Sequence, residues 1–132
     1  MLGINEADHE ESSPDATLPL IRKLSCSLKG QSGKVHLQDG SQVSRIYGMK
    51  EVFEDFACNY GVNPLYQDRL NSEDLQVSGV DDEKAIRIVE LKSQPFFIAT
   101  LFLPQLRSTP EAPHPLLVAY LKAALEHKSL LE

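Results

Sequence analysis

Apolar and polar residues alternate in the first third of the chain, which predicts β-strands. The alternation covers residues 21–28 and 34–38. The turn-rich stretch 29–33 between them favours a β-hairpin. The dipeptide Asp39-Gly40 indicates another turn. A third strand is then predicted over residues 42–47.

The middle of the chain combines an ambiguous segment with a well-marked helix start. Residues 51–60 fit either a strand or a short helix, and a strand is favoured over 56–60. Asn63 followed by Pro64 is typical of a helix start, because the side chain caps the first turn and proline needs no backbone donor there. This helix is predicted to end between residues 70 and 75.

The last third predicts a second hairpin, an apolar strand and a helix. Residues 76–80 and 85–91 form the hairpin. The continuous apolar run 95–102 is typical of a strand covered on both faces, as in the centre of an α/β sheet. A helix is predicted from Pro115, and it should lie on the sheet that contains this strand. Its apolar stripe consists of Leu116, Leu117, Tyr120, Leu121, Ala124 and Leu125.

Length and composition place the chain among small globular proteins. Its 132 residues have room for one domain, and 42% of them are hydrophobic. Residues 1–19 are polar and turn-prone, which favours a linker or a truncated edge, so the folded part is expected over 20–132. His9 lies among acidic residues, and a solvated loop is favoured there over a metal site. No metal or cofactor is expected.

Charge and hydropathy argue against two kinds of partner. The formal net charge is −6 and the 13 Lys and Arg residues are scattered, so no nucleic acid is expected as a partner. No apolar run approaches the roughly 20 residues that span a bilayer, and the first residues lack the pattern of a secretory signal. A cytoplasmic location is therefore expected. The two cysteines, Cys26 and Cys58, do not make a disulfide framework.

The most informative motif lies at residues 94–106, which read QPFFIATLFLPQL. It resembles the end of the class I glutamine amidotransferase domain of CTP synthases, where a strand H-P-F-[FY]-[VI]-A-T-Q runs into F-H-P-E-F. Residues 62–64 resemble the family's Y-E-V-N-P segment, and 75–79 its L-x-x-S-G strand. Residues 87–91, R-I-V-E-L, are similar to its E-I-V-E-L strand. Residues 116–125 match its terminal helix.

The order of these motifs implies a fold. It is the C-terminal portion of a flavodoxin-like α/β glutamine amidotransferase domain, with β-hairpins and a C-terminal amphipathic helix. A closer likeness is to small stand-alone proteins related to the CTP synthase C-terminal region, which share the C-N-Y-G-V-N-P run found here at 58–64. In that group Leu2 falls mid-domain, so Met1 is interpreted as a late or internal start.

The resemblance also implies glutamine hydrolysis by covalent catalysis, but the residues for it are absent. The family uses a cysteine within G-x-C-x-G, a histidine, and a glutamate two residues after that histidine. This sequence contains no G-x-C-x-G. Leu103 and Gln105 occupy the histidine and glutamate positions of F-H-P-E. No catalytic residue is therefore expected.

The remaining cysteines and histidines are weaker candidates for chemistry. Cys58 is the candidate for a reactive thiol, against the favoured alternative of a small buried hydrophobe, since no histidine or basic residue lies within five positions of it. Cys26, in the centre of a predicted strand, is a weaker candidate than Cys58. His114 is interpreted as a helix cap rather than a catalytic residue. His36 and His127 are expected on the surface.

Three functions remain open. The favoured one is a non-catalytic amidotransferase-like protein that is partner-dependent or regulatory. A sheet without its first strands leaves an apolar edge, so a protein partner, a homo-oligomer or poor solubility is expected. The second is a portion of a glutamine-hydrolysing CTP synthase of pyrimidine nucleotide biosynthesis that needs a missing N-terminal half. The third is a small-metabolite binding module that uses the former substrate cleft, with an unknown ligand.

Overall fold

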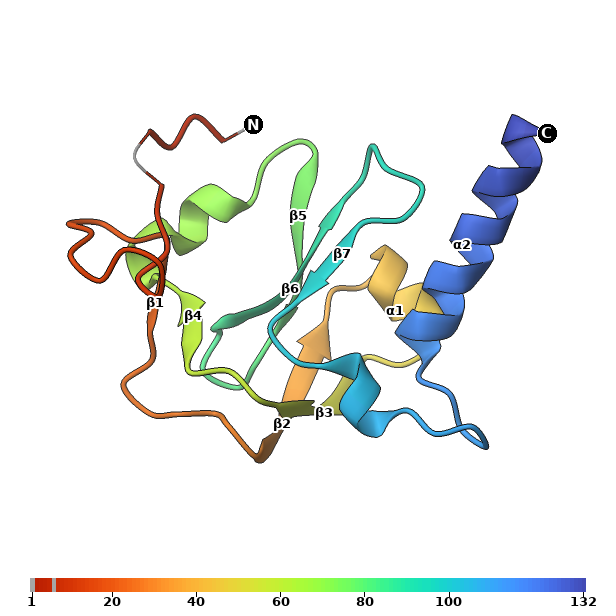
Figure 1. The fold of residues 1–132 in the computed structure, drawn as a ribbon, viewed down its shortest axis with the longest axis horizontal. Coiled ribbons are helices and arrows are strands. Elements are labelled where there is room, and N and C mark those ends of the chain that lie inside the picture. Colours follow the sequence, from red (N-terminus) through yellow and green to blue (C-terminus); the bar gives the residue numbers. More distant parts are fainter. Residues whose placement is uncertain (1, 6) are drawn as a thin grey trace.

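The computed structural model describes residues 2–5 and 7–132. Within them the chain forms seven strands, two α-helices and two 3₁₀ helices (Figure 1). In chain order these are β1 (Ile21–Lys23), β2 (Gln31–Leu37), α1 (Gln42–Tyr47), β3 (Glu51–Phe56), β4 (Tyr60–Val62), η1 (Pro64–Leu70), β5 (Leu75–Val80), β6 (Ile86–Leu91), β7 (Ile98–Thr100), η2 (Pro104–Arg107) and α2 (Pro115–Leu131). The interpretation of Met1 as a late start concerns a residue outside the described ones.

An antiparallel five-stranded sheet in the order β3-β2-β5-β6-β7 carries most of the contacts between elements. β1 pairs with β4 in a separate two-stranded sheet. The predicted hairpin across residues 81–82 is confirmed, because β5 and β6 pair with Leu75 opposite Leu91. In the described part of the chain β7 pairs with β6 and lies at the edge of the sheet.

Two apolar clusters hold these layers together. The larger one joins β2 and β3 to α1 and to the start of α2, with Phe56 and Phe102 in edge-to-face contact at 6.2 Å between ring centroids. A fully buried Val, Leu, Ile or Phe side chain stabilises a fold by about 1.5–3 kcal/mol relative to the same side chain exposed to water. Its buried members are Val35, Leu37, Val43, Val52, Phe56, Ile88, Phe102 and Leu116. The smaller cluster contains Leu70, Leu75 and Ile86.

The prediction of a strand over residues 42–47 is wrong, because this segment is helix α1. The Ser41 hydroxyl accepts a hydrogen bond from the Ser44 amide at 3.1 Å, which caps the first turn. Gly48 ends the helix in the left-handed region at φ 67°. This short helix places Val43 in the core, fully shielded from solvent.

The predicted hairpin between residues 21–28 and 34–38 is also wrong. Ile21 pairs with Val62 instead, while Val35 of β2 lies opposite Val52 of β3. Both pairings join segments that are separated by other structure, so local alternation could not reveal them. The ambiguous segment 51–60 is a strand that ends at Phe56, not a strand over 56–60.

The helix start at Asn63 is confirmed, and η1 ends at Leu70 within the predicted bounds. The Asn63 side chain accepts from the Leu65 amide at 3.1 Å and donates to the Pro19 carbonyl at 2.8 Å. The helix is of the 3₁₀ type rather than α. The second contact ties it to the polar N-terminal segment, where the proposed boundary at residue 19 stays a prediction.

The prediction that residues 95–102 form a covered central strand is wrong. Only Ile98–Thr100 is strand, and Phe97 is 43% exposed. The apolar run is long, but β7 is an edge strand of the described sheet, so its outer edge pairs with no other strand there.

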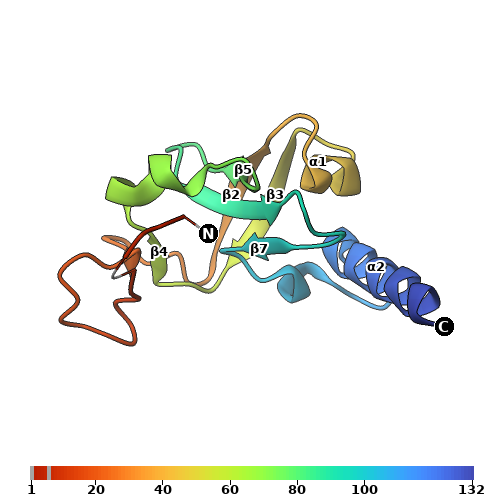
Figure 2. The same ribbon diagram turned by 90° about the horizontal axis from the view of Figure 1, so that it is seen from above.

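The predicted C-terminal helix is confirmed as α2, but its placement on the sheet is wrong. The helix contacts α1 and η2 and then projects away from the sheet (Figures 1 and 2). Of its predicted stripe only Leu116 is buried, while Leu125 is 65% exposed. In the described residues, no helix is long and apolar enough to cross a membrane.

Candidate functional site

Leu103 and Gln105, at the positions expected for a catalytic histidine and glutamate, lie where β7 leads into η2. Leu103 precedes the first turn of η2, and its amide donates to the Asp55 carbonyl at 3.3 Å, beside the end of β3. Gln105 is exposed. A leucine side chain cannot accept or donate a proton, and a neutral amide cannot balance the charge of an imidazolium. This turn therefore supplies no acid–base group from either side chain.

The two cysteines lie in loops rather than in strands. Cys58 is partly exposed between β3 and β4, where its carbonyl accepts from the Leu28 amide at 3.3 Å. Cys26 is exposed and lies in the loop between β1 and β2, so its predicted position inside a strand is wrong. Neither thiol forms a hydrogen bond or a disulfide in the part of the chain that the structure describes. Whether Cys58 is reactive stays an open prediction.

A buried polar cluster joins β3, α1 and the start of α2. His114 Nε2 lies 2.9 Å from Glu54 Oε1, and the side chains are only 3% and 2% exposed. The Tyr47 hydroxyl donates to the same carboxylate oxygen. Burial, followed by the hydrogen bond and the charge of Glu54, raises the pKa of Tyr47 far above its ordinary value.

The cap at the start of α2 engages the second ring nitrogen of His114. Its Nδ1 accepts from the Leu116 amide at 3.2 Å. Its Nε2 is then the nitrogen that donates to Glu54. Because both nitrogens are engaged, His114 is a structural cap, as predicted, and not a free base.

Sequence reasoning missed Glu54 and Tyr47 as partners of His114. A charged residue is expected on the outer face of a strand, but Glu54 points inward with Val52 and Phe56. The only sequence signal is this two-residue period of β3. Among described residues, the second carboxylate oxygen of Glu54 has no hydrogen-bond partner.

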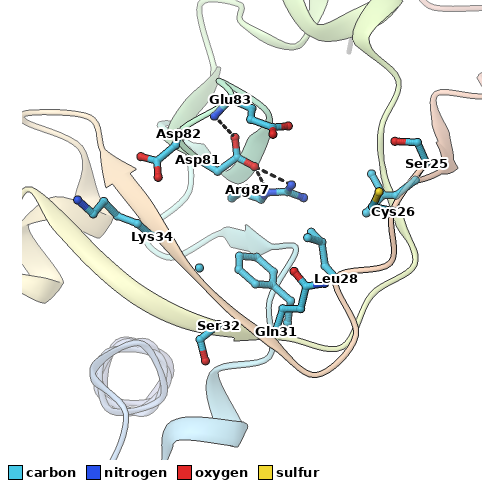
Figure 3. Close-up of a pocket in the computed structure, with 13 residues that line it drawn as sticks. Ser25, Cys26, Leu28, Gln31, Ser32, Lys34, Asp81, Asp82, Glu83 and Arg87 are labelled. Atoms are coloured by element: carbon cyan, nitrogen blue, oxygen red, sulfur yellow. Dashed lines mark hydrogen bonds and ion pairs between the residues drawn. The ribbon is translucent and has the colours of Figure 1, made fainter.

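A cleft of about 430 Å³ opens between the loop after β1, the start of β2 and the β5–β6 turn (Figure 3). Leu103, Gln105 and Cys58 do not line it. Its walls are apolar at the loop and charged at the turn. The lining residues are Leu24, Ser25, Cys26, Leu28, Gln31, Ser32, Gly33, Lys34, Phe56, Asp81, Asp82, Glu83 and Arg87.

A buried ion pair forms the back of this cleft. Arg87 donates to one oxygen of Asp81 through Nε at 3.0 Å and Nη2 at 2.7 Å. The Arg87 side chain is only 7% exposed, and its guanidinium carbon lies 5.3 Å from the centroid of the Phe56 ring. The other oxygen of Asp81 accepts from the amides of Glu83 and Ala85 at 2.9 Å each. The pair thus locks the β5–β6 turn onto the sheet.

His36 lies at the rim of the cleft, and His127 lies away from it. His36 is partly exposed and pairs with Asp82 and Glu51. The hydrogen bond from His36 lowers the pKa of the Asp82 carboxyl. His127 is exposed on α2. Within residues 2–5 and 7–132, no group of three His, Cys, Asp or Glu side chains is placed to hold a metal.

No protein-family model matches the chain. Its sequence is 34% identical over 145 aligned residues to CTP synthase of Bifidobacterium longum, covering 98% of this chain and 26% of that protein. It is 32% identical over 132 aligned residues to CTP synthase of Saccharolobus solfataricus, covering 93% and 25%. The chain therefore spans about a quarter of the length of the curated relatives it matches.

The fold also matches solved structures. The glutaminase domain of Trypanosoma brucei CTP synthase, solved with bound acivicin, superposes with a TM-score of 0.86 at 26% identity, covering 96% of this chain and 53% of that one. A GMP synthase-type protein from Thermoplasma acidophilum gives a TM-score of 0.61 at 15% identity, covering 84% and 51%. The second likeness concerns the fold alone.

Proposed function

The chain is related to the glutaminase domain of CTP synthases, a class I glutamine amidotransferase domain, and from this premise we propose that it is a non-catalytic member that acts through a protein partner. The observation that carries the proposal is Leu103, a side chain without a titratable group at the turn between β7 and η2. The fold-class prediction is confirmed by the same likeness.

Without these residues, most of the catalytic rate enhancement is lost. A nucleophile, its base and the acid that orients the base act as a unit, and loss of the nucleophile or base alone lowers kcat by about 10⁶-fold in a well-studied hydrolase. This sequence lacks the G-x-C-x-G nucleophile motif and has Leu103 and Gln105 at the other two positions. With all three roles vacant, only positioning effects remain, so turnover should not exceed background.

Neither His114 nor His36 is placed to take over the missing role. His114 is buried with both ring nitrogens hydrogen-bonded, to Glu54 and to the Leu116 amide. Freeing either nitrogen would break the cap of α2 or leave a buried carboxylate without one of its donors. His36 contacts two carboxylates, and neither cysteine forms a hydrogen bond with it in the described residues.

Two exposed features support a protein partner. One edge of β7 is unpaired in the described sheet, and such an edge is a template for another strand. The outer part of α2 presents large apolar side chains to solvent, which marks interaction surfaces in folded proteins. These residues are Tyr120, Leu121, Leu125, Leu130 and Leu131.

The proposal is tested by incubating the purified chain with glutamine and measuring ammonia. The expected result is release at the rate of a protein-free blank, for the wild type and for the Leu103→His/Gln105→Glu variant, because a base and its orienting acid cannot act without a nucleophile. Ammonia release by the wild-type chain above the blank would overturn the proposal.

A further inference from the structure

Arg87 has a hydrogen-bonding group that the fold does not use. Its residue is 6% exposed, and Nε and Nη2 are both engaged with Asp81. Within the described residues, Nη1 forms no hydrogen bond. Figure 3 shows the guanidinium between the β5–β6 turn and the wall formed by Cys26 and Leu28. The strand motif that residues 87–91 resemble, E-I-V-E-L, begins with glutamate where this chain has Arg87.

The β5–β6 turn beside Arg87 carries an acceptor that is also without a partner. The Glu83 side chain lines the cleft, and its carboxylate forms no hydrogen bond or ion pair in the described part of the chain. Asp82 is instead held by His36 at 2.6 Å, and Lys34 by Glu51 at 3.3 Å. Among the charged groups that line the cleft, Arg87 Nη1 and the Glu83 carboxylate are therefore the two without a partner in the described residues.

The overall charge of the cleft disfavours a simple anion as its ligand. Three carboxylates line it against two cations, so a molecule with only a negative charge is repelled. A molecule with only a positive charge leaves the Nη1 donor of Arg87 without a partner. A ligand that carries both charges satisfies both groups.

The remaining wall of the cleft is apolar, which favours a ligand with an apolar portion. Leu24, Leu28 and the Phe56 ring form it, and the volume of about 430 Å³ is within the range of small-molecule sites. We propose that this cleft binds a zwitterionic α-amino acid with an apolar side chain. Its carboxylate accepts from Arg87 Nη1, its ammonium donates to Glu83, and its side chain contacts the apolar wall.

This site is separate from the proposed loss of catalysis. None of Leu103, Gln105 and Cys58 lines the cleft, so binding there neither requires nor precludes ammonia release. The two ideas therefore fail independently. Bound ligand would tie the loop after β1 to the β5–β6 turn, two segments that the sheet alone does not pair.

Calorimetric titration with three matched probes tests the proposal. Leucine carries both charges, isopentylamine keeps only the ammonium, and 4-methylpentanoate keeps only the carboxylate. Leucine should bind saturably, and each single-charge analogue at least tenfold more weakly, since each loses a charge-assisted hydrogen bond. Equal binding of an analogue and leucine, or no saturable binding of leucine, would overturn it.

Variants then locate the binding. Glu83→Gln should weaken leucine binding about tenfold, whereas Glu73→Gln, also exposed and on a loop, should leave it unchanged. Arg87→Lys keeps a cation for Asp81 but removes Nη1, and it should weaken binding similarly; its fold is checked by circular dichroism. Binding that Glu83→Gln leaves intact would refute the site even if Arg87→Lys fails to fold.

Discussion

Replacing His114 by alanine is the most informative single change to the fold. The side chain is 3% exposed and makes two contacts at once, to the Glu54 carboxylate at 2.9 Å and to the Leu116 amide at 3.2 Å. Alanine removes both. It also leaves Glu54, already lacking a partner for one oxygen, with the Tyr47 hydroxyl as its remaining donor in the described structure.

The expected loss follows from these two contacts. An N-cap contributes about 1 kcal/mol, and a hydrogen bond to a buried charged group about 1.5–3 kcal/mol. Water offsets little of this loss, because Glu54 stays buried and is poorly solvated once its partner is removed. The free energy of unfolding should therefore fall by about 2.5–4 kcal/mol, a large fraction of the 5–15 kcal/mol roughly typical of a domain.

Urea denaturation followed by circular dichroism measures this loss, with two comparison variants. His114→Asn retains a capping side chain but cannot reach Glu54, so it should be about 1 kcal/mol more stable than His114→Ala. His127→Ala, exposed on the same helix, should stay within about 0.5 kcal/mol of wild type. A loss below about 1 kcal/mol for His114→Ala would refute the structural role assigned to the buried cluster.

Two further predictions concern Tyr47 and Gly33. Because the pKa of Tyr47 is raised in the folded state, its contribution to stability is present below its ordinary value of 10.0 and is lost as pH rises further. The unfolding free energy of wild type should thus fall more steeply above about pH 10 than that of Tyr47→Phe, and parallel pH profiles would contradict this. In Gly33→Ala the new methyl group would lie 2.8 Å from the buried Phe56 ring, which should cost about 1–3 kcal/mol in urea denaturation; an unchanged midpoint would show that the ring can move.

Signals confined to a few neighbouring residues predicted the structure well. Asn63 and Pro64 marked the start of η1, and Pro115 marked the start of α2. The turn at residues 81–82 gave the β5–β6 hairpin. In each case the deciding interaction, a cap or a tight turn, is made by residues adjacent in sequence.

Non-local packing explains what the sequence could not predict. The pairing of Ile21 with Val62 joins distant segments, so neighbouring strands were paired instead. Helix α1 has only six residues, too few for its periodicity to be distinguished from that of a strand. The Glu54–His114 contact spans 60 positions and buries a residue type that normally faces water.

The family motifs carried a different kind of information. They predicted the relationship to the CTP synthase glutaminase domain, which the sequence and fold comparisons confirm. They could not predict the cleft in front of Arg87, because its lining comes from segments that are far apart in the sequence. The partner of Arg87, Asp81, is six positions away, on the other side of the turn.

Ammonia release from glutamine, compared between wild type and a Cys26→Ser/Cys58→Ser variant, decides whether the chain hydrolyses glutamine through a thiol. These are the only thiols in the sequence, so covalent hydrolysis through a cysteine of this chain must disappear when both are replaced. We expect the two proteins to release ammonia equally, at the rate of the blank. Release by the wild type that the thiol-free variant lacks would contradict that expectation.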